Sequence, residues 1–175
     1  MIDTLKPMLG FAAYSGTGKT TLLKQLLPWL RGQGVRVGMI KHAHHTFEVD
    51  HPGKDSFELR KAGAEQVLVA SPQRWALMVE KHRPAEPLLS EMVGHLDQRA
   101  LDLILVEGFK HEPFPKIELF RPSRGADPLY PGDPDIIAVA SDGALPVVTE
   151  LPLLDLNDPE QIGDFIMNWL DHVHG

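Results

Sequence analysis

A glycine-rich segment between two apolar stretches constrains this chain more than any other feature of its sequence. Residues 13–20 read Ala-Tyr-Ser-Gly-Thr-Gly-Lys-Thr, preceded by the apolar run 8–13 and followed by a leucine-rich stretch with helical spacing. A strand, a glycine-rich turn ending in Gly-Lys-Thr and a helix are, in that order, the parts of a phosphate-binding loop, or P-loop. The sequence therefore predicts a site for a nucleoside triphosphate.

The segment departs from the P-loop pattern at one position, because Ala13 stands where glycine is usual. Gly16 and Gly18 are then the residues that must let the backbone fold over a phosphate. A glycine-rich turn that merely joins a strand to a helix is the alternative. The loop in its strand–helix context favours the phosphate-binding interpretation.

The chemistry expected of this loop follows from its backbone and two side chains. Backbone N–H groups from Ser15 to Thr20 would form a concave anion site, to which the first helical turn adds its partial positive charge. Lys19 would reach the β- and γ-phosphates, and the Thr20 hydroxyl would bind Mg²⁺. Both residues are therefore candidate ligand-binding residues.

Composition excludes several other kinds of protein. The 175 residues include no cysteine, which rules out disulfides, thiolate zinc sites and cysteine nucleophiles. A formal net charge of -7 argues against non-specific nucleic-acid binding. No apolar run approaches the roughly 18 residues of a membrane span, and the first residues lack the apolar core of a signal peptide. We expect a single nucleotide-binding domain over residues 1–175, located in the cytoplasm.

Apolar patterning predicts strands that alternate with helices. We expect strands at 8–13, 35–40, 101–106 and 136–140, and helices after the P-loop, at 55–62 (capped by Asp55 or Ser56), at 85–98 and after a capping box formed by Asp158 and Gln161. Residues 66–70 and 75–80 predict a hairpin, and 116–120 an edge or hairpin strand. The pattern indicates an α/β protein with the three-layer fold of P-loop NTPases, a mostly parallel sheet and an antiparallel hairpin insertion.

Sheet geometry selects an acidic partner for the P-loop. In an open α/β sheet, ligands bind outside the carboxyl ends of the strands. Asp102 begins the strand near 101–106, whereas Glu107 follows its end. We therefore expect Glu107 to contact Mg²⁺, directly or through water, or to orient an attacking water. The alternative is a solvated carboxylate at the end of a strand.

Two further acidic positions are candidates. Asp50 and Asp55 flank Pro-Gly-Lys after the second strand, where a loop can approach a γ-phosphate, so either could hold Mg²⁺ or a catalytic water. Turn and capping chemistry explains both equally well. Asp142 follows the strand 136–140, and its carboxylate could accept hydrogen bonds from N1–H and the exocyclic amine of guanine.

Histidines and basic residues raise two more hypotheses. His42, His44 and His45 could bind a metal, but their spacing and the lack of cysteine favour loop histidines or phosphate donors. Several basic residues fall in predicted loops and could contact a second anionic ligand, or could simply be solvated. They are Lys41, Lys54, Arg60, Lys61, Arg74 and Lys110.

Stretches along nearly the whole chain resemble the molybdopterin-guanine dinucleotide biosynthesis adapter proteins, the MobB family. The matching stretches are Ser15–Leu23, Ile40–His42 with His44 and His45, Asp50 with Pro52–Ser56, Glu58–Ala64, Gln73–Met78, Leu101–Lys110 and Ile137–Asp142. The Lys-His-x-His-His and Val-Glu-Gly-Phe-Lys segments are more specific than the P-loop itself. The resemblance is weak at 81–100 and 121–135.

This resemblance implies a homodimer that binds GTP with Mg²⁺ and hydrolyses it slowly at best. It implies work beside the molybdopterin guanylyltransferase, the enzyme that joins GMP to molybdopterin, with molybdopterin itself a candidate ligand. It places the nucleotide on Ser15, Gly16, Thr17, Gly18, Lys19, Thr20 and Thr21, with Glu107 as the acidic partner. The resemblance does not fix the roles of Lys41, His42 or Lys110. Lys41 and Lys110 are candidate nucleotide contacts, and Asp55 is a candidate catalytic residue.

Two other functions remain open at this point. Related metal-chaperone and partitioning ATPases often carry an extra lysine early in the loop, but Tyr14 stands there, so a lysine supplied across a dimer is not expected. A metallochaperone GTPase is suggested only by the histidine loop. A small-molecule kinase would need an acceptor base and a lid, and the sequence has no arginine-rich lid segment.

Overall fold

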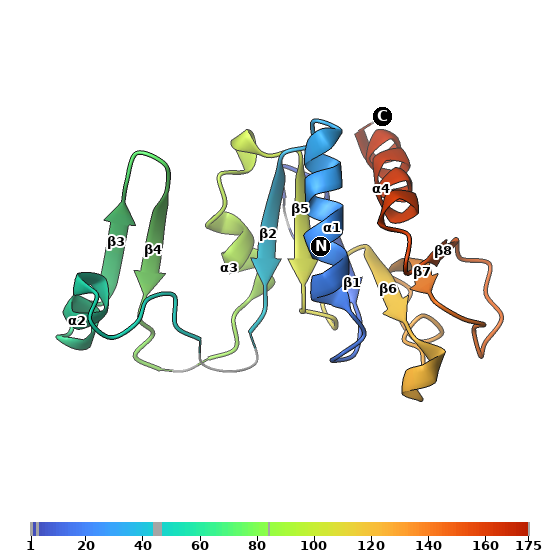
Figure 1. Cartoon of the computed structure of the whole chain (residues 1–175), viewed down its shortest axis with the longest axis horizontal. Coiled ribbons are helices and arrows are strands. Elements are labelled where there is room, and N and C mark those ends of the chain that lie inside the picture. The colour runs from blue at the N-terminus through green and yellow to red at the C-terminus, as the bar shows by residue number, and fades with distance from the viewer. Residues whose placement is uncertain (1, 3, 44–46, 84, 175) are drawn as a thin grey trace. The chain divides into compact units, whose positions relative to one another are not determined.

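The computed structural model describes residues 2, 4–43, 47–83 and 85–174 (Figure 1). The chain divides into two compact units, one formed by Met1–His42 with Leu88–Gly175 and the other by Ala43–Pro87. The first unit contains the P-loop. The single nucleotide-binding domain expected over residues 1–175 stays a prediction.

The first unit is built on a six-stranded sheet in the order β2-β5-β1-β6-β7-β8. Its strands are β1 (Met8–Ala12), β2 (Val37–Lys41), β5 (Leu103–Glu107), β6 (Lys116–Phe120), β7 (Ile136–Ser141) and β8 (Leu153–Asp155). Each neighbouring pair is parallel, so the carboxyl ends of the strands share one edge of the sheet. The predicted α/β fold with a mostly parallel sheet is confirmed.

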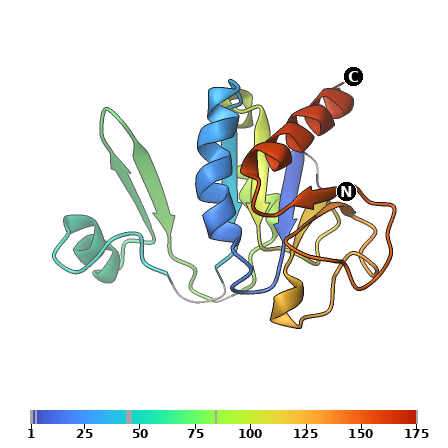
Figure 2. The ribbon, with the colours of Figure 1, turned by 45° about the vertical axis from the view of Figure 1, so that its right-hand side comes forward.

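Two long helices cover one face of this sheet (Figure 2). They are α1 (Lys19–Gly32) and α4 (Pro159–His174), and they contribute Leu22, Leu26, Leu30, Ile162 and Ile166 to a core that also holds the side chains of the central strands. The short helix α3 (Leu89–Gly94) packs in a second core with Ile104 and Val106. Because alternate residues of a strand face opposite sides, Leu103 and Leu105 belong to the first core. The helix predicted at 85–98 is real but shorter, with a 3-10 turn at Gln98–Ala100.

The expected edge position of residues 116–120 is wrong. β6 lies between β1 and β7, and all five of its residues are buried. The polar side chains of Lys116 and Glu118 favoured an edge position in the sequence. In the structure both are buried, and each forms hydrogen bonds with backbone groups of a segment that precedes or follows the strand. The Glu118 carboxylate accepts hydrogen bonds from the backbone N–H of Leu129 (2.8 Å) and Tyr130 (2.7 Å), and Lys116 donates to the carbonyl of Glu112 (2.8 Å). A buried polar group with partners is compatible with a central strand.

The end of the sheet holds one unexpected strand and one partly confirmed cap. β8 is only three residues long, too short to show an apolar period, and was not predicted. Asp158 caps α4 as expected, accepting hydrogen bonds from the N–H groups of Glu160 (3.1 Å) and Gln161 (3.0 Å). Gln161 does not close a capping box, because its side-chain oxygen accepts from the N–H of Asp155 instead.

The second unit contains a helix, α2 (Asp55–Lys61), and a separate antiparallel sheet made of β3 (Gln66–Ala70) and β4 (Trp75–Val79). The predicted hairpin is confirmed, with Leu68 directly opposite Leu77. The predicted cap is wrong, because Lys54 occupies the cap position in an extended conformation and Asp55 is already helical.

Candidate functional site

The loop between β1 and α1 has the backbone that a P-loop needs. Gly16 and Gly18 have φ values of 77° and 106°, which side-chain-bearing residues rarely adopt. Thr17 between them is buried, and its hydroxyl donates to the carbonyl of Tyr14 at 2.8 Å. Gly18 stands directly before α1, whose first N–H groups have no partner within the helix. The two glycines therefore have the backbone conformation expected of them, and their part in phosphate binding stays a prediction.

Lys19 extends back over this loop. Its ammonium group donates to the carbonyl of Ala13 at 2.9 Å and to that of Tyr14 at 3.4 Å. Burial lowers its pKa, while Glu107 acts to raise it and Lys41 and Lys110 act to lower it further. One acidic and two basic side chains thus lie close enough to Lys19 to influence its charge.

Glu107 ends β5 beside the P-loop strand, at the position where sheet geometry predicts it. It is in register with Phe11 of β1 on one side and with Lys41 of β2 on the other. The Lys41 ammonium lies 3.1 Å from each carboxylate oxygen of Glu107. Lys41 and Glu107 were separate candidates in the sequence, and the register of β2 against β5 explains why they form one ion pair.

Asp102 lies at the opposite end of β5, as predicted. Its oxygens accept from the Arg36 side chain at 2.8 Å and 2.7 Å, and from the Arg36 backbone N–H at 2.9 Å. These hydrogen bonds hold the pKa of Asp102 well below its usual range. Asp102 is therefore committed to a contact far from the carboxyl ends of the strands.

The turn after Glu107 brings Lys110 to the P-loop. Gly108 has a φ of 93°, and a Cβ there would lie 2.5 Å from the Cβ of His42, so only glycine fits. Phe109 also has a positive φ, of 52°, and its ring stacks on His42 with centroids 4.6 Å apart. The Lys110 ammonium lies 5.1 Å from the ring centroid of Tyr14, in cation–π contact. Lys110 therefore contacts Tyr14 of the loop, and both Lys41 and Lys110 lie near enough to influence the charge of Lys19.

Two arginines after β6 hold the other side of the loop, and both were missed. Arg121 donates from Nε to the carbonyl of Thr17 at 2.8 Å and forms an ion pair with Asp142. Arg124 donates to the carbonyl of Gly16. In the sequence, Arg121 directly follows the strand predicted at 116–120. That position indicates a contact with the P-loop only if the strand is known to lie beside β1.

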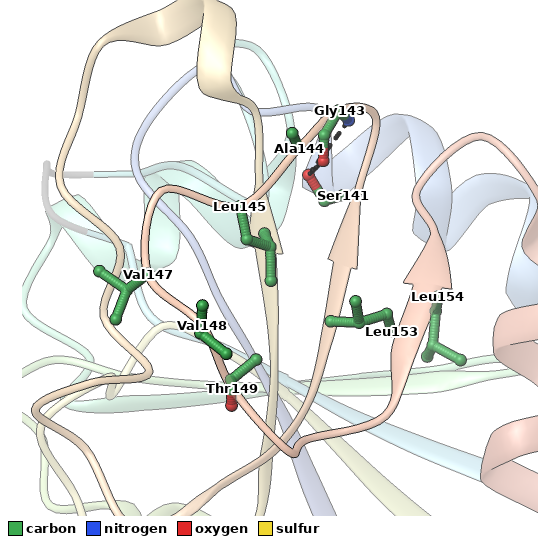
Figure 3. A pocket seen from close by; sticks show the side chains of 9 residues that line it. All are labelled: Ser141, Gly143, Ala144, Leu145, Val147, Val148, Thr149, Leu153 and Leu154. Carbon is green, nitrogen blue, oxygen red and sulfur yellow. Dashed lines mark hydrogen bonds between the residues drawn. The ribbon is translucent and has the colours of Figure 1, made fainter.

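Asp142 follows β7 at the same edge of the sheet as the P-loop, in agreement with the prediction. Ser141 and Gly143 on either side of it form a tight turn through the Ser141 hydroxyl, which contacts the Gly143 carbonyl at 2.9 Å and N–H at 3.2 Å. A cavity of about 390 Å³ opens beside this turn, lined mainly by aliphatic side chains of segment 143–149 and of β8 (Figure 3). The Asp142 carboxylate thus pairs with Arg121, and the residues on either side of Asp142 in the chain, Ser141 and Gly143, line the cavity.

The acidic and basic candidates of the second unit include a cluster in which the side chains pair with one another. Arg60 forms ion pairs with Glu48, with Asp50 at 2.6 Å and with Glu80 at 2.7 Å, and its side chain is only 8% exposed. Hydrogen bonds to these three carboxylates raise its pKa. The idea that Arg60 is available to an anionic ligand is therefore wrong, and Asp50 is occupied by the same cluster. Asp55 is exposed at the start of α2, and its catalytic role stays a prediction.

The metal hypothesis concerns residues that the structure describes only in part. Among the described residues no group of three His, Cys, Asp or Glu side chains is arranged to hold a metal. His44 and His45 lie outside the described residues. Thr20 is an exposed residue in the first turn of α1, so the predicted Mg²⁺ ligand is accessible.

Within the described part of the chain, no helix is long and apolar enough to cross a membrane.

The parallel sheet and the loop between β1 and α1 define a P-loop protein of the α/β class. The family model described as "Molybdopterin guanine dinucleotide synthesis protein B", MobB, matches residues 8–142. The chain is 53% identical over 173 residues to the molybdopterin-guanine dinucleotide biosynthesis adapter protein of Escherichia coli, covering 98% of each chain. It is 46% identical to that of Haemophilus influenzae, covering 97% of this chain and 92% of the relative. The chain belongs to the MobB family.

Solved structures agree with this assignment at the level of the fold. A MobB homologue from Bacillus stearothermophilus superposes with a TM-score of 0.71 at 23% identity, covering 94% of this chain and 98% of that one. MobB of Bacillus subtilis gives a TM-score of 0.69 at 21% identity, with 93% and 96% covered. The three-layer P-loop fold predicted from the sequence is therefore confirmed.

Proposed function

We propose that this protein is a GTP-binding adapter in molybdenum cofactor biosynthesis that assists the attachment of GMP to molybdopterin. One observation carries the proposal. The P-loop, the Lys41–Glu107 ion pair and the Arg121–Asp142 ion pair meet at one edge of the sheet, in a chain 53% identical to a protein named a molybdopterin-guanine dinucleotide biosynthesis adapter protein. The edge thus offers groups suited to the triphosphate and to the guanine base.

The triphosphate would be held by the P-loop. Backbone N–H groups of Ser15 to Thr21, together with the N-terminus of α1, provide hydrogen-bond donors and positive potential. Lys19 neutralises charge on the β- and γ-phosphates once it exchanges its carbonyl contacts for phosphate oxygens. Lys41 and Lys110 extend the positive potential beyond the γ-phosphate.

The residues present fit Mg²⁺, because the Thr20 hydroxyl and the Glu107 carboxylate are the oxygen donors that this ion prefers. A bound Mg²⁺ would neutralise charge that develops on the phosphates during hydrolysis. Glu107 also supplies the carboxylate that can orient a water. Both of its oxygens lie 3.1 Å from Lys41, and a water would have to compete with that ammonium group, which supports slow hydrolysis.

The base would lie toward Asp142. A carboxylate accepts two hydrogen bonds from guanine, at N1–H and the exocyclic amine, whereas adenine lacks this pair of donors. The aliphatic wall beside Ser141 and Gly143 offers an apolar surface for the ring. This arrangement favours GTP over ATP.

Assembly with other chains is also part of the proposal. The β3–β4 hairpin carries an apolar face on which Leu68 and Trp75 are 62% and 67% exposed. Such a face on a two-stranded sheet is typical of a protein contact. We propose a cytoplasmic homodimer that works with the molybdopterin guanylyltransferase, with molybdopterin as a further candidate ligand.

Two measurements test this function. Calorimetry with GTP, GDP and ATP, each with and without Mg²⁺, should show tighter binding of GTP than of ATP. A pulldown of the molybdopterin guanylyltransferase with GTP, GDP or no nucleotide should recover the partner. Equal affinity for ATP would remove the guanine assignment, and tight stoichiometric Ni²⁺ binding would favour a metallochaperone instead.

A further inference from the structure

The position of Arg121 follows from the order of the central strands. β6 lies between β1, which leads into the P-loop, and β7, which leads into Asp142. Phe120, the last residue of β6, is in register with Ser141. The residue after Phe120 therefore lies between the loop expected to hold phosphates and the carboxylate expected to read the base. That residue is Arg121.

One guanidinium group connects the two sides. Its Nε donates to the carbonyl of Thr17 at 2.8 Å, its Nη1 pairs with the Asp142 carboxylate, and its Nη2 lies 3.5 Å from the side-chain oxygen of Asn157. A Cβ on Gly18 would lie 3.6 Å from Nη2, so the group also packs along the loop. The planar fork of arginine can serve several acceptors at fixed angles, which the compact ammonium of lysine cannot do.

The contact with Thr17 bears on phosphate binding through the peptide that joins Thr17 to Gly18. In a trans peptide the C=O and the N–H point in opposite directions. Fixing the carbonyl oxygen of Thr17 against Arg121 therefore fixes the direction of the Gly18 N–H. That N–H is one of the donors of the proposed phosphate site.

The contact with Asp142 bears on the base. The ion pair engages one carboxylate oxygen, Oδ2, and restricts the rotation of the carboxylate plane. Two parallel hydrogen bonds to guanine need that plane to lie in line with the base. The same guanidinium group therefore orients the base-reading carboxylate.

We propose that Arg121 is a positioning residue that couples guanine recognition at Asp142 to the geometry of the P-loop. The proposal rests on the proposed function, because it requires a guanine nucleotide at this site. The proposed role acts through the contacts of Arg121 with the Thr17 carbonyl and the Asp142 carboxylate. It aligns the groups that do the binding, so losing it should weaken base discrimination and phosphate affinity together.

Arg121→Lys is the main test, with Arg124→Lys as its matched control. Both arginines donate to a P-loop carbonyl, but the structure pairs only Arg121 with Asp142 among the described residues. Affinities for GTP, ATP and inorganic tripolyphosphate should be measured by calorimetry, with circular dichroism to confirm folding. We expect Arg121→Lys to lower the GTP-to-ATP affinity ratio by about 10-fold and tripolyphosphate affinity by a few-fold. Arg124→Lys should lower both nucleotide affinities by the same factor.

The outcomes separate this inference from the function it rests on. If the unaltered protein shows no preference for GTP, the guanine assignment itself fails. If it prefers GTP and folded Arg121→Lys keeps the same ratio, Arg121 only stabilises the fold and the coupling is wrong. Asp142→Asn tests the link from the other side, even if Arg121→Lys does not fold. It should weaken tripolyphosphate binding as well as base selectivity, and unchanged tripolyphosphate affinity would overturn the coupling.

Discussion

Strands β2 and β5 carry an ion pair at each end, and the two pairs are built differently. At the amino end, Arg36 donates two side-chain hydrogen bonds and one backbone hydrogen bond to Asp102. Asp102 in turn donates its N–H to the carbonyl of Arg36 at 2.8 Å. Each partner thus satisfies the other, and the pair ties two neighbouring strands together.

At the carboxyl end, Lys41 meets Glu107 through one ammonium group. Lys41 is 56% exposed and Glu107 only 12% exposed, and Glu107 lies close enough to Lys19 to affect its pKa. The compact ammonium of a lysine on a flexible side chain can be displaced by a ligand more readily than a guanidinium group that forms two hydrogen bonds to one carboxylate. One strand pair therefore combines a structural contact with a contact suited to binding.

The largest effect should come from the P-loop lysine next to the second pair. Lys19→Ala removes the charge that is expected to contact the β- and γ-phosphates, so GTP affinity should fall by about 100-fold or more. Calorimetry measures the affinity, and a thermal melt checks the fold. Lys24→Ala is the control, because Lys24 is an exposed lysine on the same helix. Unchanged GTP affinity in Lys19→Ala would remove the phosphate-loop assignment.

A smaller effect, on catalysis, should come from Glu107 at the carboxyl end of β5. Glu107→Gln keeps the shape of the side chain but loses the carboxylate that is proposed to contact Mg²⁺ or water. The hydrolysis rate at saturating GTP should fall by about 10-fold to 100-fold, or its Mg²⁺ dependence should shift. The measurement is phosphate release over time. A rate and Mg²⁺ dependence equal to those of the unaltered protein would exclude Glu107 from the mechanism.

Much of this contrast was predictable from the sequence, because it depends on direction along one strand. A buried apolar run gives a strand, the strand has a beginning and an end, and ligands lie at the carboxyl end of a parallel sheet. That reasoning separates Glu107 from Asp102 without coordinates. The glycines of the P-loop and the apolar faces of α1 and α4 are likewise local patterns, and the structure confirms them.

The features that could not be predicted depend on which strands are neighbours. The pairing of Lys41 with Glu107 requires the register of β2 against β5. The contacts of Arg121 require β6 to lie beside β1. The sequence did not predict this central position, because Lys116 and Glu118 are polar side chains typical of an edge strand. Their partners come from separate loops, so no periodicity within the strand reveals that they are satisfied.

The amino-end pair should affect stability and leave binding alone. Asp102→Asn should lower the free energy of unfolding by about 1 kcal/mol, a value kept small because both side chains are partly exposed and screened by solvent. The folded pKa of Asp102 lies below its ordinary value of 3.8, so its contribution is present above that value and is lost as the pH falls through the folded pKa.

Urea unfolding of the unaltered protein and of Asp102→Asn at several pH values checks this sign. The difference between them should be constant near neutral pH and shrink below about pH 4. GTP affinity is the internal control and should not change. A difference that grows on acidification would contradict the assigned ion pair.

The smallest effect should come from Lys41→Met, which removes the Lys41–Glu107 ion pair and leaves Glu107 near Lys19. Stability should hardly change, because an exposed lysine contributes about 0 to 1 kcal/mol to an ion pair. GTP affinity should fall only a few-fold, since Lys19 remains, and the loss should be greater at about 0.05 M salt than at about 0.5 M salt because exposed charges are screened. Calorimetry at both salt concentrations measures this.

Arg36→Met is the matched substitution at the other end of the same strands. It should lower the melting temperature while leaving GTP affinity at either salt concentration unchanged. If the two variants behaved alike in both measurements, the ends of the β2–β5 pair would not differ in role.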